Sequence, residues 1–522
     1  MLKSAVVLGV WWVAAMAAYG AGPLPVATDK GAVAGKLSDD GQVRLFLGVP
    51  YAAPPVGPLR WKPPQPAARW TEVRPAQSYG SHCVQVNRFA DMQFHDPGES
   101  EDCLTLNIWA PETATAGAKL PVMVWIYGGG FYAGSTSESR QDGANFARKG
   151  VILVSMNYRL NIFGFFAHPA LAAESPEHAA GNYGLMDQAA ALQWVKRNIA
   201  AFGGDPGNVT LFGESAGSAS VSAQMASPMA KDVLAHAIGE SGGAFGRTGL
   251  ALPPLREAET KDEAFAREVL GTSSLAEMRA MPAAELVKRI EGQKAPGVRF
   301  RPVVDGLFLP RSVQEIFAVG GQAHVPMMAG WVRDEGGPPK AEMTLAGYQA
   351  MAQETWGSQA DAFLKAYPAT TDAAAQRAAA DLAADRFIAA STWEWIEAQV
   401  KTGGQPVYRF HFERPTPESR YHPASGGVFH SSEIEYVFGN LWARPAAGWS
   451  EADYKLSDMM QGYWINFAKT GDPNGPGLPQ WPRYDSADSW QVMHLDVEPV
   501  ASADTTRARY EFLRTATPVD RR

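Results

Sequence analysis

A serine flanked by glycines is the first feature of this sequence that could carry chemistry. Residues 208–220 read NVTLFGESAGSAS, which places Ser215 in a Gly-x-Ser-x-Gly pattern. A serine hydroxyl attacks a carbonyl only when a general base takes its proton and the hydroxyl is exposed to substrate. A sharp turn from a strand into a helix provides that exposure, because it holds the serine at a strained apex. The pattern therefore predicts a nucleophile on such a turn.

The same pattern occurs a second time, at Ser241 in IGESGGAF. Strand-like residues precede both serines. After Ser215 the small residues AGSASVSAQMA can begin a helix, whereas the residues after Ser241, GGAFGRTG, are too rich in glycine to form one. We therefore predict that Ser215 is the nucleophile and that Ser241 is a structural residue near the site, at the end of the next strand.

A run of glycines after an earlier strand-like segment could bind negative charge beside the serine. Residues 122–135 read VMVWIYGGGFYAGS. Consecutive glycines let backbone N–H groups face a bound carbonyl oxygen without side chains in the way. A phosphate-binding loop is the alternative, but the segment lacks the lysine followed by serine or threonine that such a loop requires. The run therefore predicts part of an oxyanion hole.

A catalytic serine on such a turn needs an acid and then a histidine further along the chain. His430, in GGVFHSSEIEYVFG, is the best candidate for the base. Asp334 and Glu335, in VPMMAGWVRDEGG, are the candidates for the acid. They follow a predicted strand, which is where the acid lies in proteins that carry a catalytic serine on such a turn. A lone histidine is more often structural, and a pair of acids in a loop is usually solvated. The residues alone leave the choice between Asp334 and Glu335 open.

Alternating strand and helix patterns must position these residues. Strands are predicted at 104–110, 122–127, 151–158, 209–212, 235–240, 325–330 and 407–412, and helices at 186–202 and 381–400. Near-continuous apolar strands separated by helices are typical of a mostly parallel sheet that is covered on both faces. The helix-rich segments 250–320 and 340–400 are expected to form a cap beside this sheet.

The composition is that of a large globular protein. The 522 residues are 46% hydrophobic and 19% charged, with a formal net charge of −8. This balance supports a large core and is unlike that of a disordered chain. The sequence has no long basic run and no zinc-finger spacing, so nucleic acid is not expected as a partner.

The first residues have the layout of a secretory signal peptide. Lys3 precedes an apolar run, and small residues follow at Ala18, Gly20 and Ala21. We predict that residues 1–21 are a cleaved signal, that the protein is secreted or periplasmic, and that it has no stable membrane insertion afterwards. An uncleaved membrane anchor is the alternative, although the apolar run is short for a membrane span.

Export also predicts a disulfide between the two cysteines of the sequence, rather than two free thiols.

Together with longer blocks, these motifs resemble the type-B carboxylesterases, the α/β-hydrolase family that includes cholinesterases and bacterial para-nitrobenzyl esterases. The blocks are GVPYAAPPVGPLRWKPPQP, SEDCLTLNIWAP, WIYGGGF, NYRLNIFGF, GNYGLMDQAAALQWVKRNIAAFGGDPGNVTLFGESAG, DEGG, HSSEIEYVFG and YWINFAKTGDPN. They extend from about residue 28 to 485. The resemblance implies a single α/β-hydrolase domain over 22–522, with a mostly parallel twisted central sheet, flanking helices and helical cap insertions.

The resemblance also assigns roles to individual positions. It implies a catalytic triad of Ser215, Glu335 and His430. The oxyanion-hole donors that it implies are Gly129, Gly130 and Ala216, and the residues adjacent to the site are Glu214 and Ser241. The disulfide is Cys83–Cys103, and the two internal ion pairs are Arg60–Glu101 and Arg159–Asp187. The sequence departs from the family at Tyr127, where many members have histidine, and we expect little loss from this because that residue donates no hydrogen bond to the oxyanion.

The predicted activity is hydrolysis of a small-molecule carboxylic ester through an acyl-enzyme, with no metal or organic cofactor. A lipase, or a carbamate or amide hydrolase with the same triad, is the first alternative. A non-catalytic cholinesterase-like binding protein is the second. The motifs predict neither the natural ester nor the oligomeric state.

Overall fold

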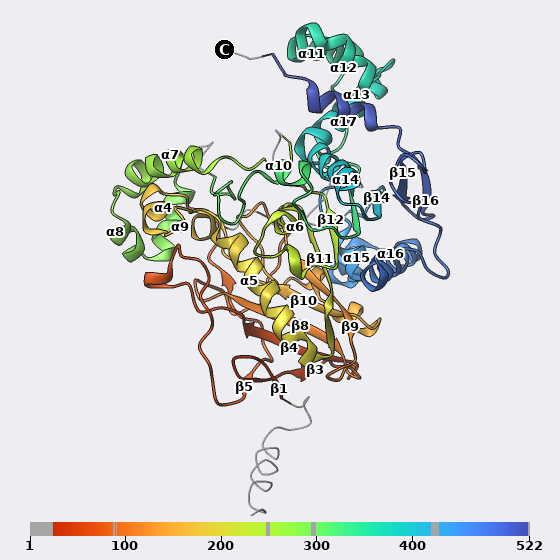
Figure 1. Ribbon diagram of the computed structural model, residues 1–522. Helices are drawn as coiled ribbons and strands as arrows, with labels where there is room; N and C mark the ends of the chain where they lie inside the picture. The colour runs from red at the N-terminus through yellow and green to blue at the C-terminus, as the bar shows by residue number, and fades with distance from the viewer. Residues whose placement is uncertain are drawn as a thin grey trace, which may run out of the picture.

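A twisted sheet of eleven strands forms the centre of the molecule (Figure 1). The computed structural model describes residues 25–86, 89, 91–246, 251–293, 299–418 and 427–519, so the predicted signal segment 1–21 lies outside the described residues. From one edge to the other, the strands are β16 (Val500–Ala503), β15 (Gln491–Leu495), β14 (Val407–Phe412), β13 (Met327–Val332), β12 (His236–Glu240), β11 (Gly204–Glu214), β9 (Leu120–Ile126), β10 (Ile152–Met156), β8 (Thr105–Pro111), β4 (Val43–Pro50) and β3 (Lys36–Leu37).

The pairing pattern confirms the predicted mostly parallel sheet. Neighbouring strands are parallel from β15 through to β10, and the pairs at both edges of the sheet are antiparallel. All seven predicted strands are present, with ends that differ by a few residues. The largest difference is at β11, which begins at Gly204 rather than at 209.

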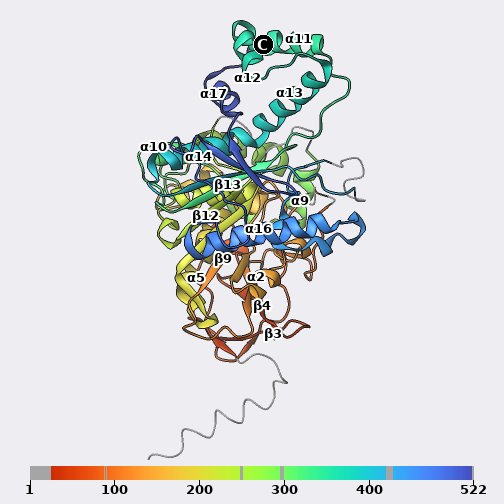
Figure 2. The same cartoon turned by 90° about the vertical axis from the view of Figure 1, so that its right-hand side faces the viewer.

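Alternating side chains in the strands show which helices cover which face. In β12, Gly239 faces Trp395 of α14 (Ala390–Thr402), and the next residue, Glu240, accepts a hydrogen bond from Trp464 of α16 (Glu451–Thr470). Successive residues of a strand point to opposite faces, so α14 and α16 lie on opposite sides of the sheet. Figure 2 shows α16 crossing one of these faces.

The other helices come from both halves of the chain. Those from the first half of the chain are α2 (Ala144–Arg148), α3 (Asn161–Phe165), α4 (Pro169–Glu174), α5 (Tyr183–Asn198) and α6 (Ala216–Ala226). The segments predicted as a cap are helix-rich as expected: they contain α7 (Leu255–Phe265), α8 (Leu275–Ala280), α9 (Ala283–Glu291), α10 (Val313–Ala318), α11 (Leu345–Trp356), α12 (Ala360–Ala366) and α13 (Asp372–Ala384). The remaining helices are α15 (Ile434–Phe438) and α17 (Arg507–Thr515). The predicted helix 186–202 corresponds to α5 followed by a 3₁₀ turn at Ile199–Phe202.

Helices α11, α12 and α13 form a satellite cluster that projects away from the sheet, beside α17 (Figure 1). They have a small hydrophobic core of their own around Tyr348 and Phe363, separate from the main core under the sheet. A five-residue π-helical segment, Asp385–Ala389, joins α13 of this cluster to α14 on the sheet. The predicted helix 381–400 therefore spans an α–π–α junction.

The N-terminal part of the chain carries two smaller sheets and the disulfide. The strands of these sheets are β1 (Val26–Ala27), β2 (Ala32–Ala34) and β5 (Arg74–Pro75), and β6 (His82–Cys83) with β7 (Glu99–Ser100). The predicted Cys83–Cys103 disulfide is confirmed. Both predicted ion pairs are also present, Arg60 with Glu101 and the buried Arg159 with Asp187. Among the described residues, no helix has both the length and the apolar content needed to span a bilayer.

Candidate active site

The turn between β11 and α6 holds Ser215 in a strained backbone conformation. Its φ is 57° and its ψ is −121°, values that a residue with a side chain rarely adopts. The two flanking glycines are required by close backbone contacts. A Cβ atom on Gly213 would lie 2.7 Å from the Ile126 carbonyl oxygen, and one on Gly217 would lie 2.0 Å from the same atom. The local sequence therefore permits a tight turn that exposes the serine hydroxyl.

A continuous hydrogen-bonded chain connects this hydroxyl to a buried carboxylate. His430 Nε2 lies 2.9 Å from Ser215 Oγ, and His430 Nδ1 lies 2.5 Å from Glu335 Oε2. The other oxygen of Glu335 accepts a hydrogen bond from the backbone N–H of Val332, at 3.1 Å. The Glu335 side chain is fully buried, whereas the His430 side chain is 27% exposed. The three side chains thus come from segments far apart in the sequence and meet in one line.

Asp334 positions the histidine segment but does not contact the histidine. Its backbone N–H donates to the Val428 carbonyl, and its carboxylate accepts from the Val428 N–H. The same carboxylate is 2.6 Å from Arg377. These contacts fix the segment that leads into His430, while the next residue, Glu335, faces the imidazole. The structure therefore places Glu335, the acid that the family resemblance implied, against the imidazole, and gives Asp334 different contacts.

The glycine run lies directly beside the serine. A Cβ atom on Gly128 would be 2.9 Å from the Cβ atom of Ser215, and Gly129 and Gly130 line the same cavity as Ser215. Gly129 has a φ of 88°, and a Cβ atom there would be 2.1 Å from a backbone oxygen. Ala216 is the first residue of α6, so its N–H has no acceptor within the helix. The three predicted donor positions therefore cluster around the serine.

Tyr127, the position that departs from the family, lies behind this loop. Its ring is buried and stacks on Tyr158, with ring centroids 4.6 Å apart. The Tyr158 hydroxyl donates to the Tyr127 carbonyl oxygen, at 2.9 Å. The residue therefore packs beneath the glycine run and does not line the cavity of Ser215.

Ser241 lies in a similar backbone conformation at the end of β12, with a φ of 54°. Its side chain is fully buried, and its hydroxyl lies 3.5 Å from Glu433. It does not line the cavity that contains Ser215. A Cβ atom on the next residue, Gly242, would lie 2.3 Å from the Ser215 carbonyl oxygen, so this second turn packs directly under the first.

Three buried glutamates lie behind the serine and the histidine, and the sequence analysis singled out only Glu214. Glu214 Oε1 is 3.2 Å from His430 Nε2. Glu240 is paired with Glu214 in the sheet register, and Glu433 follows His430 by three residues. The sequence carried a signal for Glu240 and for Glu433. Glu240 precedes Ser241 as Glu214 precedes Ser215, and Glu433 lies within the block HSSEIEYVFG.

Burial dominates the electrostatics of this glutamate group. It raises the pKa of Glu214 to about 7 and that of Glu240 to about 8. It also raises the pKa of Glu433, an effect strengthened by the charges of Glu214 and Glu240. Burial lowers the pKa of His430, but the negative charges of Glu335 and then Glu214 outweigh it and raise that pKa above its usual value. The site therefore favours positive charge on the imidazole.

A cavity of about 440 Å³ opens over the serine. Its walls are largely apolar and aromatic, and include Phe89, Leu252, Phe387 and Ile388. A second cavity of about 730 Å³ lies beside it and shares Leu252, Arg299 and Arg301. None of these wall residues carries a motif, so the sequence did not predict them. The space can hold a substrate larger than the reacting ester group alone.

The sheet topology, the turn that carries Ser215 and the Ser–His–Glu geometry define the α/β-hydrolase class. A family model described as "Carboxylesterase family" matches residues 23–513. The chain therefore belongs to the carboxylesterase family and is a carboxylic ester hydrolase.

Individual relatives support this membership over nearly the full chain. The fumonisin B1 esterase of Sphingopyxis macrogoltabida is 36% identical over 474 residues, covering 88% of this chain and 84% of that protein. The para-nitrobenzyl esterase of Bacillus subtilis is 35% identical over 493 residues, covering 91% of this chain and 95% of that protein. A solved structure of a PNB esterase matches with a TM-score of 0.79 at 34% identity, covering 94% of this chain and 99% of that one.

Proposed function

We propose that this carboxylesterase acts through an acyl-enzyme formed on Ser215, with His430 as the general base and Glu335 as the acid that orients it. The observation that carries the proposal is the continuous contact of 2.9 Å and 2.5 Å from the hydroxyl through the imidazole to the carboxylate. This is the arrangement that converts a weakly nucleophilic hydroxyl into an effective one.

In the first half-reaction, Ser215 Oγ attacks the ester carbonyl carbon and its proton passes to His430 Nε2. Glu335 stabilises the imidazolium that forms. The carbonyl oxygen becomes an oxyanion, which accepts hydrogen bonds from the N–H groups of Gly129, Gly130 and Ala216. The tetrahedral intermediate collapses as the carbon–oxygen bond to the alcohol breaks, and His430 returns the proton to the departing oxygen.

In the second half-reaction, water takes the place of the alcohol. His430 removes a proton from the water as its oxygen attacks the acyl carbon, and the same oxyanion donors stabilise the second tetrahedral intermediate. Collapse releases the carboxylic acid and returns the proton to Ser215 Oγ. No step requires a metal ion or an organic cofactor.

The two serines provide a matched test of this mechanism. We expect Ser215→Ala to lower kcat on a para-nitrophenyl ester by about 10⁴-fold or more and to abolish labelling by an organophosphate. Ser241→Ala, which alters the buried turn beneath Ser215, should keep most of the activity and all of the labelling. Near-normal turnover by a folded Ser215→Ala variant would refute the assignment.

The apolar walls of the cavity favour esters with apolar or aromatic acyl groups over small polar ones. The first alternative, a lipase, is tested by measuring activity across the concentration at which a long-chain ester forms micelles. A carboxylesterase of the proposed kind should show saturation below that point. A sharp rise only at the lipid–water interface would favour the lipase, and turnover of a matched carbamate or anilide above that of the ester would favour the other alternative.

We also propose that residues 1–21 direct export and are removed, so that the protein works in a periplasm or outside the cell. The support is the charged, apolar and small-residue order of this segment and the Cys83–Cys103 disulfide, a bond typical of oxidising compartments. The test is N-terminal mass spectrometry of the periplasmic and secreted fractions from a Gram-negative host. An exported chain that still begins at Met1 would contradict cleavage.

A further inference from the structure

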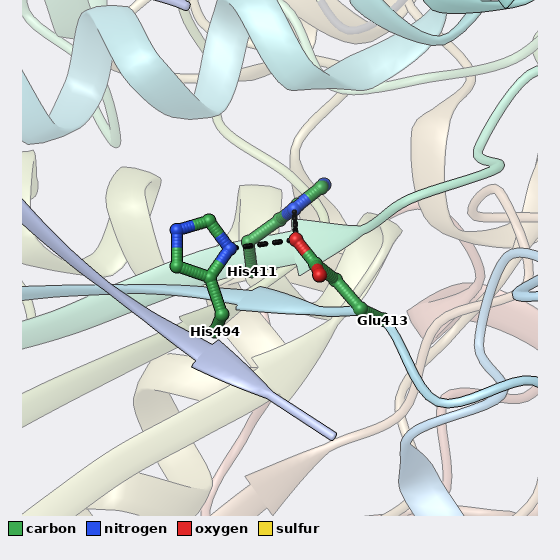
Figure 3. Close-up of side chains that lie close together, drawn as sticks. All are labelled: His411, Glu413 and His494. Carbon is green, nitrogen blue, oxygen red and sulfur yellow. Dashed lines mark hydrogen bonds and ion pairs between the residues drawn. The ribbon is translucent and has the colours of Figure 1, made fainter. Parts of the chain in front are cut away.

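Two histidines and a glutamate form a compact cluster where β14 and β15 end (Figure 3). Glu413 Oε1 lies 2.7 Å from His411 Nδ1 and 2.6 Å from His494 Nδ1. Each residue offers one ligand atom, and these atoms all lie within 4.8 Å of one another. None of the three side chains lines the cavity of Ser215, so the ester chemistry does not account for the cluster.

The sheet backbone fixes these three residues relative to one another. His411 and His494 are direct register partners on the parallel strands β14 and β15. Glu413 follows the end of β14, and its backbone N–H donates to the Leu495 carbonyl at 2.9 Å. Ligands carried by paired strands vary little in separation, so the cluster is preorganised rather than assembled from mobile loops.

A further hydrogen bond orients one imidazole for coordination through Nδ1. His494 Nε2 lies 2.9 Å from Ser502 Oγ, on the neighbouring strand β16. Histidines that bind a metal through one ring nitrogen characteristically donate the other N–H to an oxygen atom, which fixes the tautomer and the ring plane. Ser502 can accept that hydrogen bond when a cation replaces the proton on His494 Nδ1.

The three side chains are accessible to an ion, and a neighbouring arginine is already paired with a carboxylate. The side chains of His411, Glu413 and His494 are 22%, 30% and 28% exposed, so a cation and a water ligand can reach them. His411 and His494 also line a cavity of about 230 Å³. Arg409, which lines this cavity as well, is paired with the carboxylate of Asp504.

We propose that His411, Glu413 and His494 bind one divalent transition-metal ion, with Zn²⁺ as the best match, in a site that links β14 to β15. Imidazole nitrogens with one carboxylate suit zinc and its neighbours, whereas Mg²⁺ and Ca²⁺ prefer all-oxygen ligand sets. On binding, the ion replaces the two hydrogen bonds to Glu413 Oε1, and small shifts of the three side chains make room for it. Each imidazole then carries its proton on Nε2, and water completes the coordination. The ion has no part in the ester chemistry and holds the outer strands of the sheet together.

Calorimetric titration of the purified, chelator-treated chain with ZnCl₂ tests the proposal. We expect one Zn²⁺ per chain with a dissociation constant in the micromolar range or tighter, and no comparable binding of MgCl₂. Glu413→Gln and the double variant His411→Ala/His494→Ala should each weaken binding at least about tenfold. His324→Ala, which removes an exposed imidazole elsewhere, is the matched control and should bind as the parent does.

A thermal scan gives a second measurement, because a ligand that binds only the folded chain raises its Tm. Zinc should raise the Tm of the parent and of His324→Ala by a few degrees, and should leave that of His411→Ala/His494→Ala unchanged. If this double variant does not fold, Ser502→Ala decides, since it keeps all three ligands and should bind zinc about tenfold more weakly.

Two results would overturn the proposal. One is the absence of zinc uptake by the parent at about 100 μM free metal. This concentration is far above the dissociation constant expected for a preformed three-ligand site. The other is uptake that persists in His411→Ala/His494→Ala but disappears in His430→Ala, which would assign the ion to the imidazole and carboxylates beside Ser215.

Discussion

Glu335 controls the charge and orientation of His430 through a single short contact. It is fully buried, and one of its oxygens is held by a backbone N–H, so it cannot turn away from the imidazole. The neighbouring Asp334 has a different task, since its arginine and backbone contacts fix the chain that carries the histidine. One acid therefore orients the imidazole, and its neighbour places the segment that carries it.

Glu335→Gln removes the charge but keeps the shape of this side chain. We expect kcat on a para-nitrophenyl ester to fall by about 10³- to 10⁴-fold, because an amide does not stabilise the imidazolium. The matched control is Glu240→Gln, since Glu240 is also buried and its raised pKa of about 8 keeps it largely protonated at neutral pH. Similar losses in both variants would contradict a specific role for Glu335.

Glu214→Gln should change the pH dependence of the same reaction. Protonated His430 cannot accept the serine proton, so kcat/KM falls as the pH drops through the pKa of this histidine. The charge of Glu214 raises that pKa, so its removal lowers the pKa and moves the acidic limb of the profile to lower pH. The measurement is kcat/KM against pH for parent and variant, and an unchanged limb would show that Glu214 has no electrostatic effect on the base.

The elbow between β11 and α6 depends on backbone contacts that exclude a side chain at two positions. Gly217→Ala places a methyl group against the Ile126 carbonyl oxygen, at 2.0 Å without adjustment. We expect a loss of stability of about 1–3 kcal/mol and at least about a tenfold lower kcat, because α6 must move and carry Ser215 with it.

Gly292→Ala is the control for that substitution. Gly292 ends α9 with a helical φ of −72°, and an added Cβ atom would be 3.3 Å from its nearest neighbour. Its stability and activity should stay close to those of the parent. Denaturant unfolding and ester kinetics measure both variants, and equal behaviour would show that the elbow tolerates a side chain.

Arg299 and Arg301 line both cavities and place two guanidinium groups where the cavities meet. We predict that esters with a carboxylate on the acyl part depend on these residues. Arg299→Ala/Arg301→Ala should raise KM for such an ester about tenfold relative to a neutral ester of equal length. Lys261→Ala, which alters only the second cavity, is the control, and equal effects on both esters would contradict the prediction.

Sequence patterns predicted the parallel strands well because these strands are buried on both faces and form apolar runs. The length of strand β11 was underestimated, because its first residues, GDPGN, have the composition of a turn. Strands β15 and β16 were not predicted at all, because both mix polar with apolar residues instead of forming an apolar run. Local periodicity therefore describes the centre of the sheet better than its edges.

The Cys83–Cys103 bond joins residues separated by 20 positions in the N-terminal region. The chain-entropy model gives a loop of this size a stabilisation of about 3 kcal/mol. Cys83→Ser/Cys103→Ser should therefore lower Tm by a few degrees in a thermal scan. Treatment of the parent with a reductant should reproduce the shift, and an unchanged Tm would show that the bond does not limit stability.

Sequence motifs predict the contacts between the reacting residues but not the walls of the cavity. The contacts of Ser215 and His430 follow from motifs, because the turn and the histidine loop have strict local requirements. The walls of the cavity do not, because Phe89, Arg299 and Phe387 come from unrelated segments and meet only in the folded chain. Substrate preference therefore belongs to tertiary packing, while the chemistry belongs to short sequence blocks.

The π-helical segment Asp385–Ala389 offers a simple way to change substrate preference. It carries Phe387, whose ring lies 5.2 Å from that of His430. A π-helical turn accommodates one residue more than an α-helical turn would, and a single residue corresponds to about 100° of rotation around a helix. Losing one residue here would regularise the helix and swing the phenyl ring away from the imidazole. A one-codon deletion is therefore a route by which evolution can reshape the mouth of the pocket.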